Sequence, residues 1–456
     1  MKYFGTDGIR GRVGESPMTA EFALRLANAS AQILAPDGGK VLIGKDTRIS
    51  GYMFESALEA GFVSAGMDVK LLGPIPTPAI AYLVKKYNAE LGIVISASHN
   101  SFVDNGIKFF NSKGTKLDDK TELQIENILN GTTFTKDSID LGRATIDSLA
   151  RERYQEFCIS SYKNKEDLQN MKVIFDGANG AAYKVGPRIL NSLGAEVLSI
   201  GCSPNGKNIN ENCGSTHPEL LQQTVKAVGA DVGIALDGDG DRVVMVDENG
   251  NLLDGDQLLF ILAMYCKENN MLKNPVVGTV LSNLGLEESL KSHGIEFMRS
   301  KVGDRNILSL LRETGGNLGG EASGHMICMD YVETGDGLIT AIQVLEIMKN
   351  KNSSLSNLAS GMKKYPQVIE NIDNKNNFNV SDSKEIETLV EDIEKKLEGK
   401  GRLILRPSGT EPLIRIMLEG ERRDDLISHM NDLKPVSYTH LRAHETPEHR
   451  GCRRGG

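Results

Sequence analysis

The sequence predicts a multidomain α/β protein, with three α/β units followed by a smaller α+β unit. Apolar runs of strand length alternate with apolar residues at helical spacing, and this pattern restarts near residues 171 and 256. Such alternation is typical of mainly parallel sheets covered by helices. The chain has 456 residues, which is too long for one hydrophobic core. We therefore expect domains at residues 1–152, 153–254, 255–364 and 365–434, and a disordered or foreign tail at residues 435–456.

The first unit contains the most informative strand pattern. Residues 91–95, LGIVI, form an unbroken apolar run, which predicts a strand buried on both faces of a sheet. Asn105-Gly106 predicts a tight turn into a returning strand at residues 107–110, while the three glycines of residues 3–12 predict a loop. The remaining pattern predicts helices at residues 19–34, 54–64 and 79–86, and strands at residues 41–43 and 69–72.

The later units repeat the alternation. In the second unit we expect strands at residues 173–175, 197–200 and 232–236, a glycine-rich turn at 176–182, and helices at 185–193 and 217–228. In the third we expect helices at residues 258–266, 284–292 and 305–312, and strands at 276–281 and 295–298. A polar stretch at residues 351–383 indicates a junction. In the fourth we expect helices at residues 385–397 and 424–433, and strands at 402–405 and 413–418.

The composition of the chain argues against several classes of protein. The net charge is -9 and no basic patch stands out, which argues against a nucleic-acid partner. There is no apolar run of 18 residues and no signal-peptide core, so neither a membrane span nor secretion is expected. The six cysteines include no Cys-x-x-Cys pair, which favours free thiols in a reducing compartment. We expect a cytoplasmic protein.

Ser98 directly follows the buried run at residues 91–95. Ligands of open α/β sheets bind beyond the carboxyl ends of the strands, so this hydroxyl, with His99 beside it, would face a cleft. The alternative is a polar turn in which Ser98 only caps a backbone group. On this stretch alone the second interpretation is favoured.

Asp237, Asp239 and Asp241 give the strongest chemical signal. These carboxylates alternate with glycines directly after a predicted buried strand. They would repel one another without a cation between them, and their hard oxygen ligands suit Mg²⁺ or Ca²⁺. A calcium-binding helix–loop–helix is excluded, because its sixth position requires glycine and Arg242 stands there. A solvated acidic turn is the weaker alternative.

Two further loops carry polar groups that suit a phosphorylated sugar. In GGEASGH, residues 319–325, alternating polar side chains could hold sugar hydroxyls, although a lone histidine is more often structural. In RPSGTEP, residues 406–412, with Arg415 downstream, hydroxyls and two guanidiniums could surround one phosphate. For the second loop, a proline-pinned turn is an equal alternative.

The motifs FGTDGIRG, SASHN, DGDGDR, GEASGH and RPSGTEP occur in this order and resemble those of the α-D-phosphohexomutase superfamily. The resemblance spans about residues 3–434. It implies four domains around a central cleft, three of them related mixed α/β units and the last a phosphate-binding domain. The first and fourth motifs most resemble those of bacterial members that act on amino-sugar phosphates.

The resemblance also assigns roles to residues. Ser98 matches the phosphorylated serine, and its phosphate joins Asp237, Asp239 and Asp241 as ligands of one Mg²⁺. Catalytic basic groups match Lys108, His99 and Arg10. Sugar contacts match Glu321 and Ser323, with His325 added from the same loop, and Arg242 is expected near the metal loop. The site for the phosphate that does not react matches Arg406, Ser408, Gly409, Thr410 and Arg415.

The implied reaction converts glucosamine 6-phosphate to glucosamine 1-phosphate through phospho-Ser98 and a 1,6-bisphosphate. It feeds UDP-N-acetylglucosamine and cell-wall precursor synthesis. Mg²⁺ and a hexosamine or hexose 1,6-bisphosphate activator are the expected cofactors, and a homodimer and an activating kinase are compatible partners. Alternatives are a phosphomannomutase/phosphoglucomutase, a non-catalytic sugar-phosphate-binding relative, or a phosphohydrolase that uses phospho-Ser98.

Overall fold

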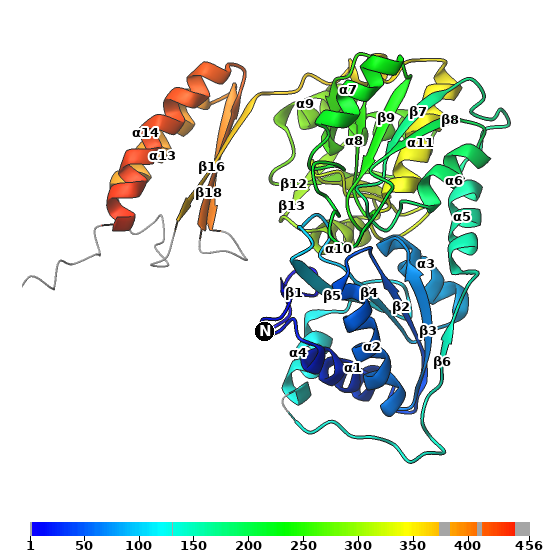
Figure 1. The fold of residues 1–456 in the computed structure, drawn as a ribbon. Helices are drawn as coiled ribbons and strands as arrows, with labels where there is room; N and C mark the ends of the chain where they lie inside the picture. Colours follow the sequence, from blue (N-terminus) through cyan, green and yellow to red (C-terminus); the bar gives the residue numbers. More distant parts are fainter. Residues whose placement is uncertain (1, 130, 374–383, 408–412, 443–456) are drawn as a thin grey trace, which may run out of the picture. The chain divides into compact units, whose positions relative to one another are not determined.

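The computed structural model describes residues 2–129, 131–373, 384–407 and 413–442. The chain forms two compact units, and each is described by itself (Figure 1). The first unit comprises residues 1–282 and 289–362 and holds three sheets; the second comprises residues 283–288 and 363–456 and holds a fourth sheet. The domain boundaries expected from the sequence stay predictions.

The first sheet has six strands in the order β1-β5-β4-β2-β3-β6. β2, β3, β4 and β6 run parallel, whereas β5 and β1 are antiparallel to their neighbours on that edge. The strands are β1 (Ile9–Arg12), β2 (Gly39–Lys45), β3 (Met67–Pro74), β4 (Leu91–Ile95), β5 (Asp104–Asn111) and β6 (Ala144–Ile146). The helices are α1 (Ala20–Leu34), α2 (Ser50–Ser64), α3 (Thr77–Tyr87) and α4 (Asp119–Leu129).

The predicted strand at residues 91–95 is confirmed, since β4 has these bounds and every residue in it is buried. Two other predictions were wrong. Residues 9–12 form strand β1 rather than loop, and Asn105-Gly106 lies within β5 rather than in a turn. Gly106 pairs with Arg10, and a Cβ there would lie 2.6 Å from the Ser96 carbonyl oxygen. Close approach of the backbone, not a turn, therefore requires this glycine.

The second sheet has the strand order β11-β10-β9-β7-β8. β7, β8 and β9 are parallel, and β9 turns back into β10 through the loop that carries the three aspartates. The strands are β7 (Lys172–Asp176), β8 (Glu196–Ile200), β9 (Val232–Leu236), β10 (Val243–Val246) and β11 (Leu252–Leu253). The helices are α5 (Ala150–Ser161), α6 (Val185–Ser192) and α7 (Glu219–Val228).

The third sheet has the order β13-β12-β14-β15, with only β15 antiparallel. Its strands are β12 (Val276–Thr279), β13 (Phe297–Ser300), β14 (Leu318–Gly320) and β15 (Met326–Cys328). Its helices are α8 (Gly255–Glu268), α9 (Leu284–Ser292), α10 (Asp304–Thr314), α11 (Gly337–Lys351) and α12 (Leu355–Ala359).

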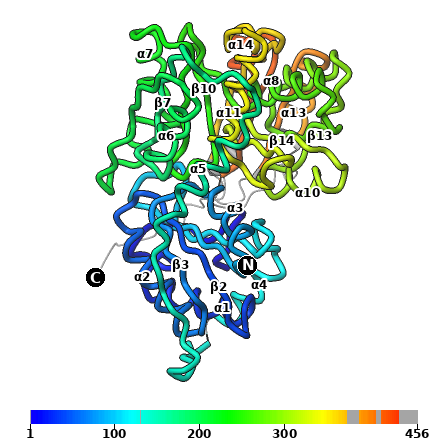
Figure 2. The backbone as a smooth tube through the Cα atoms, turned by 90° about the vertical axis from the view of Figure 1, so that its right-hand side faces the viewer, coloured from blue at the N-terminus to red at the C-terminus, as the bar shows by residue number. Residues whose placement is uncertain are grey.

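Helix α5 ties the three sheets of the first unit together. It packs against α3, α6 and α11, which belong to the first, second and third sheet (Figures 1 and 2). The buried Tyr154 of α5 donates a hydrogen bond of 2.8 Å to Asp336, the residue that caps the start of α11. The three α/β layers thus share buried contacts.

The second unit contains an antiparallel sheet in the order β16-β18-β17. Its elements are β16 (Gln367–Asp373), β17 (Gly401–Pro407), β18 (Leu413–Gly420), α13 (Lys384–Leu397) and α14 (Arg423–Arg442). It has its own apolar core, which includes Ile393, Ile416 and Leu426. The sequence pattern missed β16. It also ended the last helix too early, because α14 continues past residue 434; the rest of the predicted tail lies outside the described residues.

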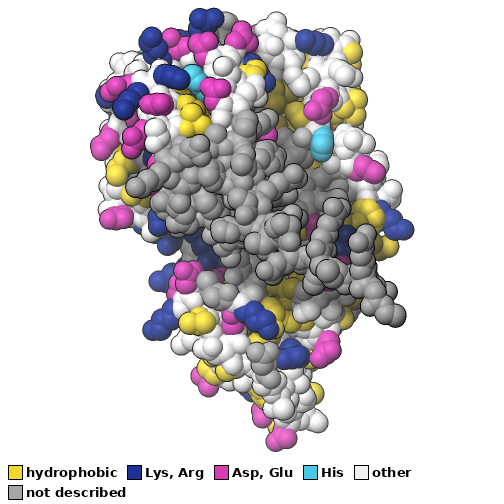
Figure 3. Space-filling view, turned by 90° about the vertical axis from the view of Figure 1, so that its left-hand side faces the viewer, with side chains coloured by type: hydrophobic (Ala, Val, Ile, Leu, Met, Phe, Trp, Pro, Cys, Tyr) yellow, Lys and Arg dark blue, Asp and Glu magenta, His cyan; other side chains and the backbone are white. Residues whose placement is uncertain are grey.

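Within the described ranges, no helix combines the length and apolarity needed to cross a bilayer. Cys158, Cys202, Cys213, Cys266 and Cys328 all carry free thiols. Acidic and basic side chains are interspersed on the face shown in Figure 3, so the described part of that face carries no basic stripe of the kind that binds nucleic acid.

Candidate active site

Ser98 lies just beyond the carboxyl end of β4, in an uncommon backbone conformation. Its φ is 54°, in the left-handed region that few non-glycine residues adopt. Its amide donates to Ser96 Oγ (2.9 Å), while its carbonyl accepts from Arg48 Nη2 (3.3 Å) and Asn210 Nδ2 (2.9 Å). These bonds come from several loops, so they fix the serine and offset its strained backbone.

The three aspartates lie in the turn between β9 and β10, and all are buried. Their exposed fractions are 0% for Asp237, 1% for Asp239 and 5% for Asp241, and one carboxylate oxygen from each lies within 4.8 Å of the others. Asp239 Oδ1 and Asp241 Oδ1 are buried and have no hydrogen-bond partner among the described residues. Buried anionic oxygens without donors are costly unless a cation binds them, so this cluster fits a hard divalent ion such as Mg²⁺.

The serine and the aspartate turn meet directly. Ser98 Oγ donates to Asp237 Oδ2 at 2.5 Å, although the two residues are 139 positions apart. Burial, followed by repulsion from Asp241 and Asp239, raises the pKa of Asp237 well above its usual range. The predicted nucleophile and the predicted metal ligands therefore form one cluster, which joins the first and second sheets.

Lys108 is the buried cation of this cluster. Its Nζ lies 2.7 Å from Asp239 Oδ2, 2.9 Å from Asp7 Oδ2 and 3.5 Å from Asp241 Oδ2. Burial lowers the pKa of Lys108, but attraction to Asp239, Asp7 and Asp241 outweighs burial and raises it. Lys108 is thus a fixed positive charge beside the serine.

His99, Arg10 and Arg242 border the same cluster. His99 Nδ1 lies 3.4 Å from Ser98 Oγ and 3.2 Å from Arg242 Nη1. Burial first, and then Arg242 and Arg10, lower the pKa of His99 to about 4, so its imidazole is uncharged at neutral pH. Arg10 extends from β1 and pairs with Asp7.

The predicted sugar loop lies between β14 and β15. The Glu321 carboxylate accepts from the Gly303 amide (3.0 Å) and from Ser323 Oγ (3.2 Å). His325 differs from its neighbours, since it is only 4% exposed. Its Nε2 accepts from the Gly335 amide at 3.0 Å, and its Nδ1 lies 3.8 Å from Asp241 Oδ2. The structure therefore places His325 behind the metal loop, where it supports Asp241.

Sequence reasoning missed four residues that complete the cluster. Asp7 pairs with both Lys108 and Lys116, Lys116 also pairs with Asp304 of the third domain, and Thr77 bonds to Asp239. A charged residue in a glycine-rich segment marks Asp7 in the sequence. Lys116, Asp304 and Thr77 carry no such local signal, because only the fold brings them to the site.

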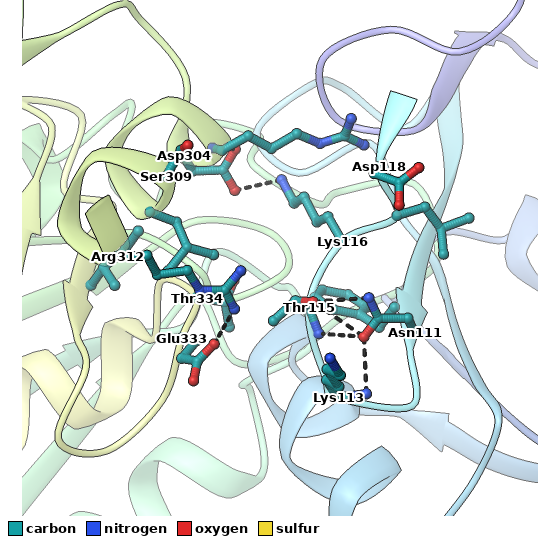
Figure 4. A pocket seen from close by; sticks show the side chains of 15 residues that line it. Asn111, Lys113, Thr115, Lys116, Asp118, Asp304, Ser309, Arg312, Glu333 and Thr334 are labelled. Atoms are coloured by element: carbon teal, nitrogen blue, oxygen red, sulfur yellow. Dashed lines mark hydrogen bonds and ion pairs between the residues drawn. The ribbon is translucent and has the colours of Figure 1, made fainter. Parts of the chain in front are cut away.

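A pocket of about 490 Å³ borders the Lys116–Asp304 pair. It lies between the segment that follows β5 and helix α10, and Figure 4 shows Lys116 and Asp304 facing each other across it. On the same lining, Arg312 pairs with Glu333. The Lys116–Asp304 pair thus links the first and third domains beside the cluster.

The predicted phosphate loop belongs to the second unit. Ser408, Gly409 and Thr410 lie outside the described residues. Arg406 and Arg415 are paired directly across β17 and β18, so both side chains leave the same face of the sheet. Burial, and then Arg415, lower the pKa of Arg406. Like charges placed opposite each other favour an anion bound on that face.

Comparison with known proteins agrees with this site and fold. Four family models match in order: phosphoglucomutase/phosphomannomutase alpha/beta/alpha domains I, II and III at residues 1–136, 152–250 and 254–365, and the C-terminal domain at residues 367–432. The chain therefore belongs to the phosphoglucomutase/phosphomannomutase family, a class of phosphohexomutase enzymes.

Within this family, several curated relatives at about half identity are named phosphoglucosamine mutase. The protein of that name from Alcanivorax borkumensis is 50% identical over 95% of this chain and 98% of its own length. The one from Yersinia pestis (strain Pestoides F) is 51% identical over 94% of this chain and 96% of its own.

Solved structures share the fold at low identity. A phosphoglucomutase/phosphomannomutase family protein from Burkholderia thailandensis has a TM-score of 0.78 and 23% identity, and covers 97% of this chain and 98% of its own. An Aspergillus fumigatus N-acetylphosphoglucosamine mutase has a TM-score of 0.67 and 16% identity, and covers 95% of each chain.

Proposed function

We propose that this enzyme interconverts glucosamine 6-phosphate and glucosamine 1-phosphate through a phosphorylated Ser98. The observation that carries the proposal is the contact of 2.5 Å between Ser98 Oγ and Asp237, inside a buried cluster of three aspartates and Lys108. The relatives named phosphoglucosamine mutase, at about half identity over nearly the whole chain, support the amino-sugar substrate.

The reaction needs two phosphoryl transfers at one serine. In the first, the bond from phosphorus to Ser98 Oγ breaks as the substrate O1 bonds to phosphorus, and O1 loses its proton. The resulting 1,6-bisphosphate turns around in the site. In the second, Ser98 Oγ attacks the phosphorus on O6, that P–O6 bond breaks, and O6 takes up a proton. The product is glucosamine 1-phosphate and Ser98 is phosphorylated again.

Different side chains of the site would have different roles in these two transfers. Lys108 and Arg10 place positive charge near the transferred group, and His99 lies close enough to Oγ to exchange a proton. Asp237, Asp239 and Asp241, with the Ser98 phosphate, would hold Mg²⁺, which supplies charge neutralisation when bound. Glu321 and Ser323 would hold sugar hydroxyls. Arg406 and Arg415, with the loop between them, would hold the phosphate that does not react.

The test is intact-protein mass and peptide mapping before and after incubation with a hexosamine 1,6-bisphosphate and Mg²⁺. We expect a gain of one phosphate on Ser98 that glucosamine 6-phosphate removes. Ser101→Ala is the matched control and should still gain phosphate, whereas Ser98→Ala should not. A Ser98 that stays unmodified would contradict the proposal and favour a sugar-phosphate-binding protein.

Turnover of glucosamine, glucose and mannose phosphates identifies the substrate. We expect the highest kcat/KM for glucosamine 6-phosphate. A higher kcat/KM for a neutral sugar would instead establish a phosphomannomutase/phosphoglucomutase. Free phosphate as the main product would establish a phosphohydrolase. The free thiols and the phosphorylated substrate support a cytoplasmic location, and native mass would detect a homodimer.

A further inference from the structure

One residue of the first domain bonds to a predicted metal ligand of the second without belonging to any predicted motif. Thr77 is the first residue of α3 and is 1% exposed. Its amide donates to the Asp239 carbonyl at 2.8 Å, and its hydroxyl donates to Asp239 Oδ2 at 2.5 Å, across 162 positions of sequence. Thr77 therefore fixes both the backbone and the carboxylate of Asp239.

The two carboxylate oxygens of Asp239 differ in their hydrogen bonding. Oδ2 accepts from Thr77 Oγ1 and from Lys108 Nζ at 2.7 Å. Oδ1 is buried and has no hydrogen-bond partner among the described residues. Two donors on Oδ2 prevent the carboxylate from rotating, so one particular oxygen stays available to a cation.

The backbone around Thr77 is unusually constrained. Proline residues stand on both sides, at positions 76 and 78, and each ring fixes its own φ while restricting the residue before it. Pro76 also packs against the metal loop, because a Cβ at Gly240 would lie 3.2 Å from the Pro76 Cβ atom. The Thr77 hydroxyl is thus held in place before any ligand binds, at little further cost in entropy.

We propose that Thr77 is a positioning residue for the divalent cation: its hydroxyl holds Asp239 Oδ2 and thereby presents Asp239 Oδ1 to the metal. The inference rests on the proposed function, because it assumes that the aspartates bind a metal. Partners that orient metal ligands typically contribute about 10- to 100-fold in metal affinity. Thr77 belongs to the first domain, so metal affinity also reports how that domain sits against the second.

The test measures Mn²⁺ binding directly, by calorimetry or by the electron paramagnetic resonance signal of free Mn²⁺, on the full chain. Thr77→Val keeps the shape and removes the hydroxyl, and should raise the Kd for Mn²⁺ by about 10- to 100-fold. Thr77→Ser restores the donor and should recover affinity to within about threefold of wild type. The Mg²⁺ concentration for half-maximal turnover should rise in Thr77→Val more than kcat at saturating Mg²⁺ falls.

Thr47→Val is the matched control. Thr47 also lies in the first domain, and its hydroxyl also donates to the second domain, at the Asn179 carbonyl, but it touches no aspartate of the cluster. We expect wild-type Mn²⁺ affinity for this variant. An equal loss in Thr47→Val would assign the effect to domain docking in general and overturn the inference.

The remaining outcomes separate this inference from the proposed function. Mn²⁺ binding by Thr77→Val with wild-type affinity would overturn the role of Thr77 and leave the mutase proposal intact. Failure of the wild-type protein to bind Mn²⁺ would contradict the proposed metal site itself. Circular dichroism checks the fold of each variant, and Thr77→Ala replaces Thr77→Val in the same comparison if the valine variant does not fold.

Discussion

Ser98 adopts a left-handed backbone conformation that serine does not favour by itself. The role of its hydroxyl in the site explains why this conformation is kept. A φ of 54° costs a non-glycine residue on the order of 1–3 kcal/mol. The Ser98 amide donates to Ser96 Oγ, and the Ser98 carbonyl accepts from Arg48 and Asn210; together these bonds over-determine the conformation. The result is a hydroxyl directed at Asp237, and such strain is commonly kept at functional sites.

Ser98→Ala should abolish turnover without unfolding the protein. Alanine lacks the oxygen that carries the phosphoryl group, and loss of a covalent nucleophile typically lowers kcat by about 10³-fold or more. Steady-state kinetics and thermal unfolding measure the two effects. Ser101→Ala, at an exposed neighbouring position, should keep wild-type turnover. Substantial turnover by Ser98→Ala would rule out Ser98 as the carrier.

Lys108→Met should destabilise the protein strongly. The lysine amine is buried against Asp239, Asp7 and Asp241, and removing one partner of a buried charge cluster typically costs about 3–5 kcal/mol. Urea unfolding measures the loss. The exposed Lys113 provides the control, because Lys113→Met should change stability by less than about 0.5 kcal/mol. Equal stability of the two variants would contradict the ionised cluster.

At the scale of elements, the start of α11 couples the helix to the metal loop. Asp336 caps the helix by accepting from the amides of Leu338 and Ile339, both at 3.0 Å. The next amide, of Gly337, donates to the Gly240 carbonyl at 3.1 Å. A third-domain helix thus helps to hold the turn that carries the aspartates.

Asp336→Asn should change how stability depends on pH. Burial raises the pKa of Asp336 from its usual 3.8 to about 6, despite the hydrogen bonds it accepts from Ile339 and Tyr154. Between these values the folded protein holds a proton that the unfolded chain has lost, so stability from this group is present at low pH and is lost as pH rises through 6. Asp336→Asn has no carboxyl group to titrate at this position, so it does not lose this stability as pH rises.

We therefore expect Asp336→Asn to gain stability relative to wild type between pH 4 and pH 7, by up to about 3 kcal/mol. Urea unfolding at several pH values measures this difference. Asp37→Asn, at an exposed position, should show no such gain. A wild-type-to-variant difference that does not change with pH would show that Asp336 titrates normally.

Local elements are also where sequence reasoning succeeded. The apolar run at residues 91–95 predicted a buried strand, and the alternating aspartates and glycines after residue 236 predicted a converging turn. The expected turn at Asn105-Gly106 failed because the signal is local, whereas the glycine is needed for a distant contact with Ser96. Local signals cannot distinguish these two uses of glycine.

At the scale of the whole molecule, cation binding should stabilise the folded chain. The expected ligands come from the first and second domains, so binding requires both in place. At a free Mg²⁺ concentration of 100 times Kd, the stabilisation is about 2.7 kcal/mol. Thermal unfolding with Mg²⁺ or with a chelator measures it. Asp237→Asn should lose the response, while Glu211→Gln, at an exposed position, should keep it; an equal response in both would place the cation elsewhere.

The packing of domains also explains which residues of the site could not be predicted from the sequence. Asp237 could be named in advance from its own local pattern, whereas Ser98 and Lys108 could be assigned only through the resemblance of several motifs to a known superfamily. Thr77, Lys116 and Asp304 could not be, since they act through partners that only the packing of domains supplies. Their local sequence resembles that of any helix start or strand end.

The distance in sequence between Ser98 and its aspartate partner has a consequence for biosynthesis. Because 139 positions separate Ser98 from Asp237, a growing chain completes the first sheet well before any of the three aspartates has been made. Under the proposed function, such a nascent chain holds its serine without the carboxylates and cannot exchange phosphoryl groups. Phosphate that reaches Ser98 by such exchange would thus mark a chain whose domains have already assembled.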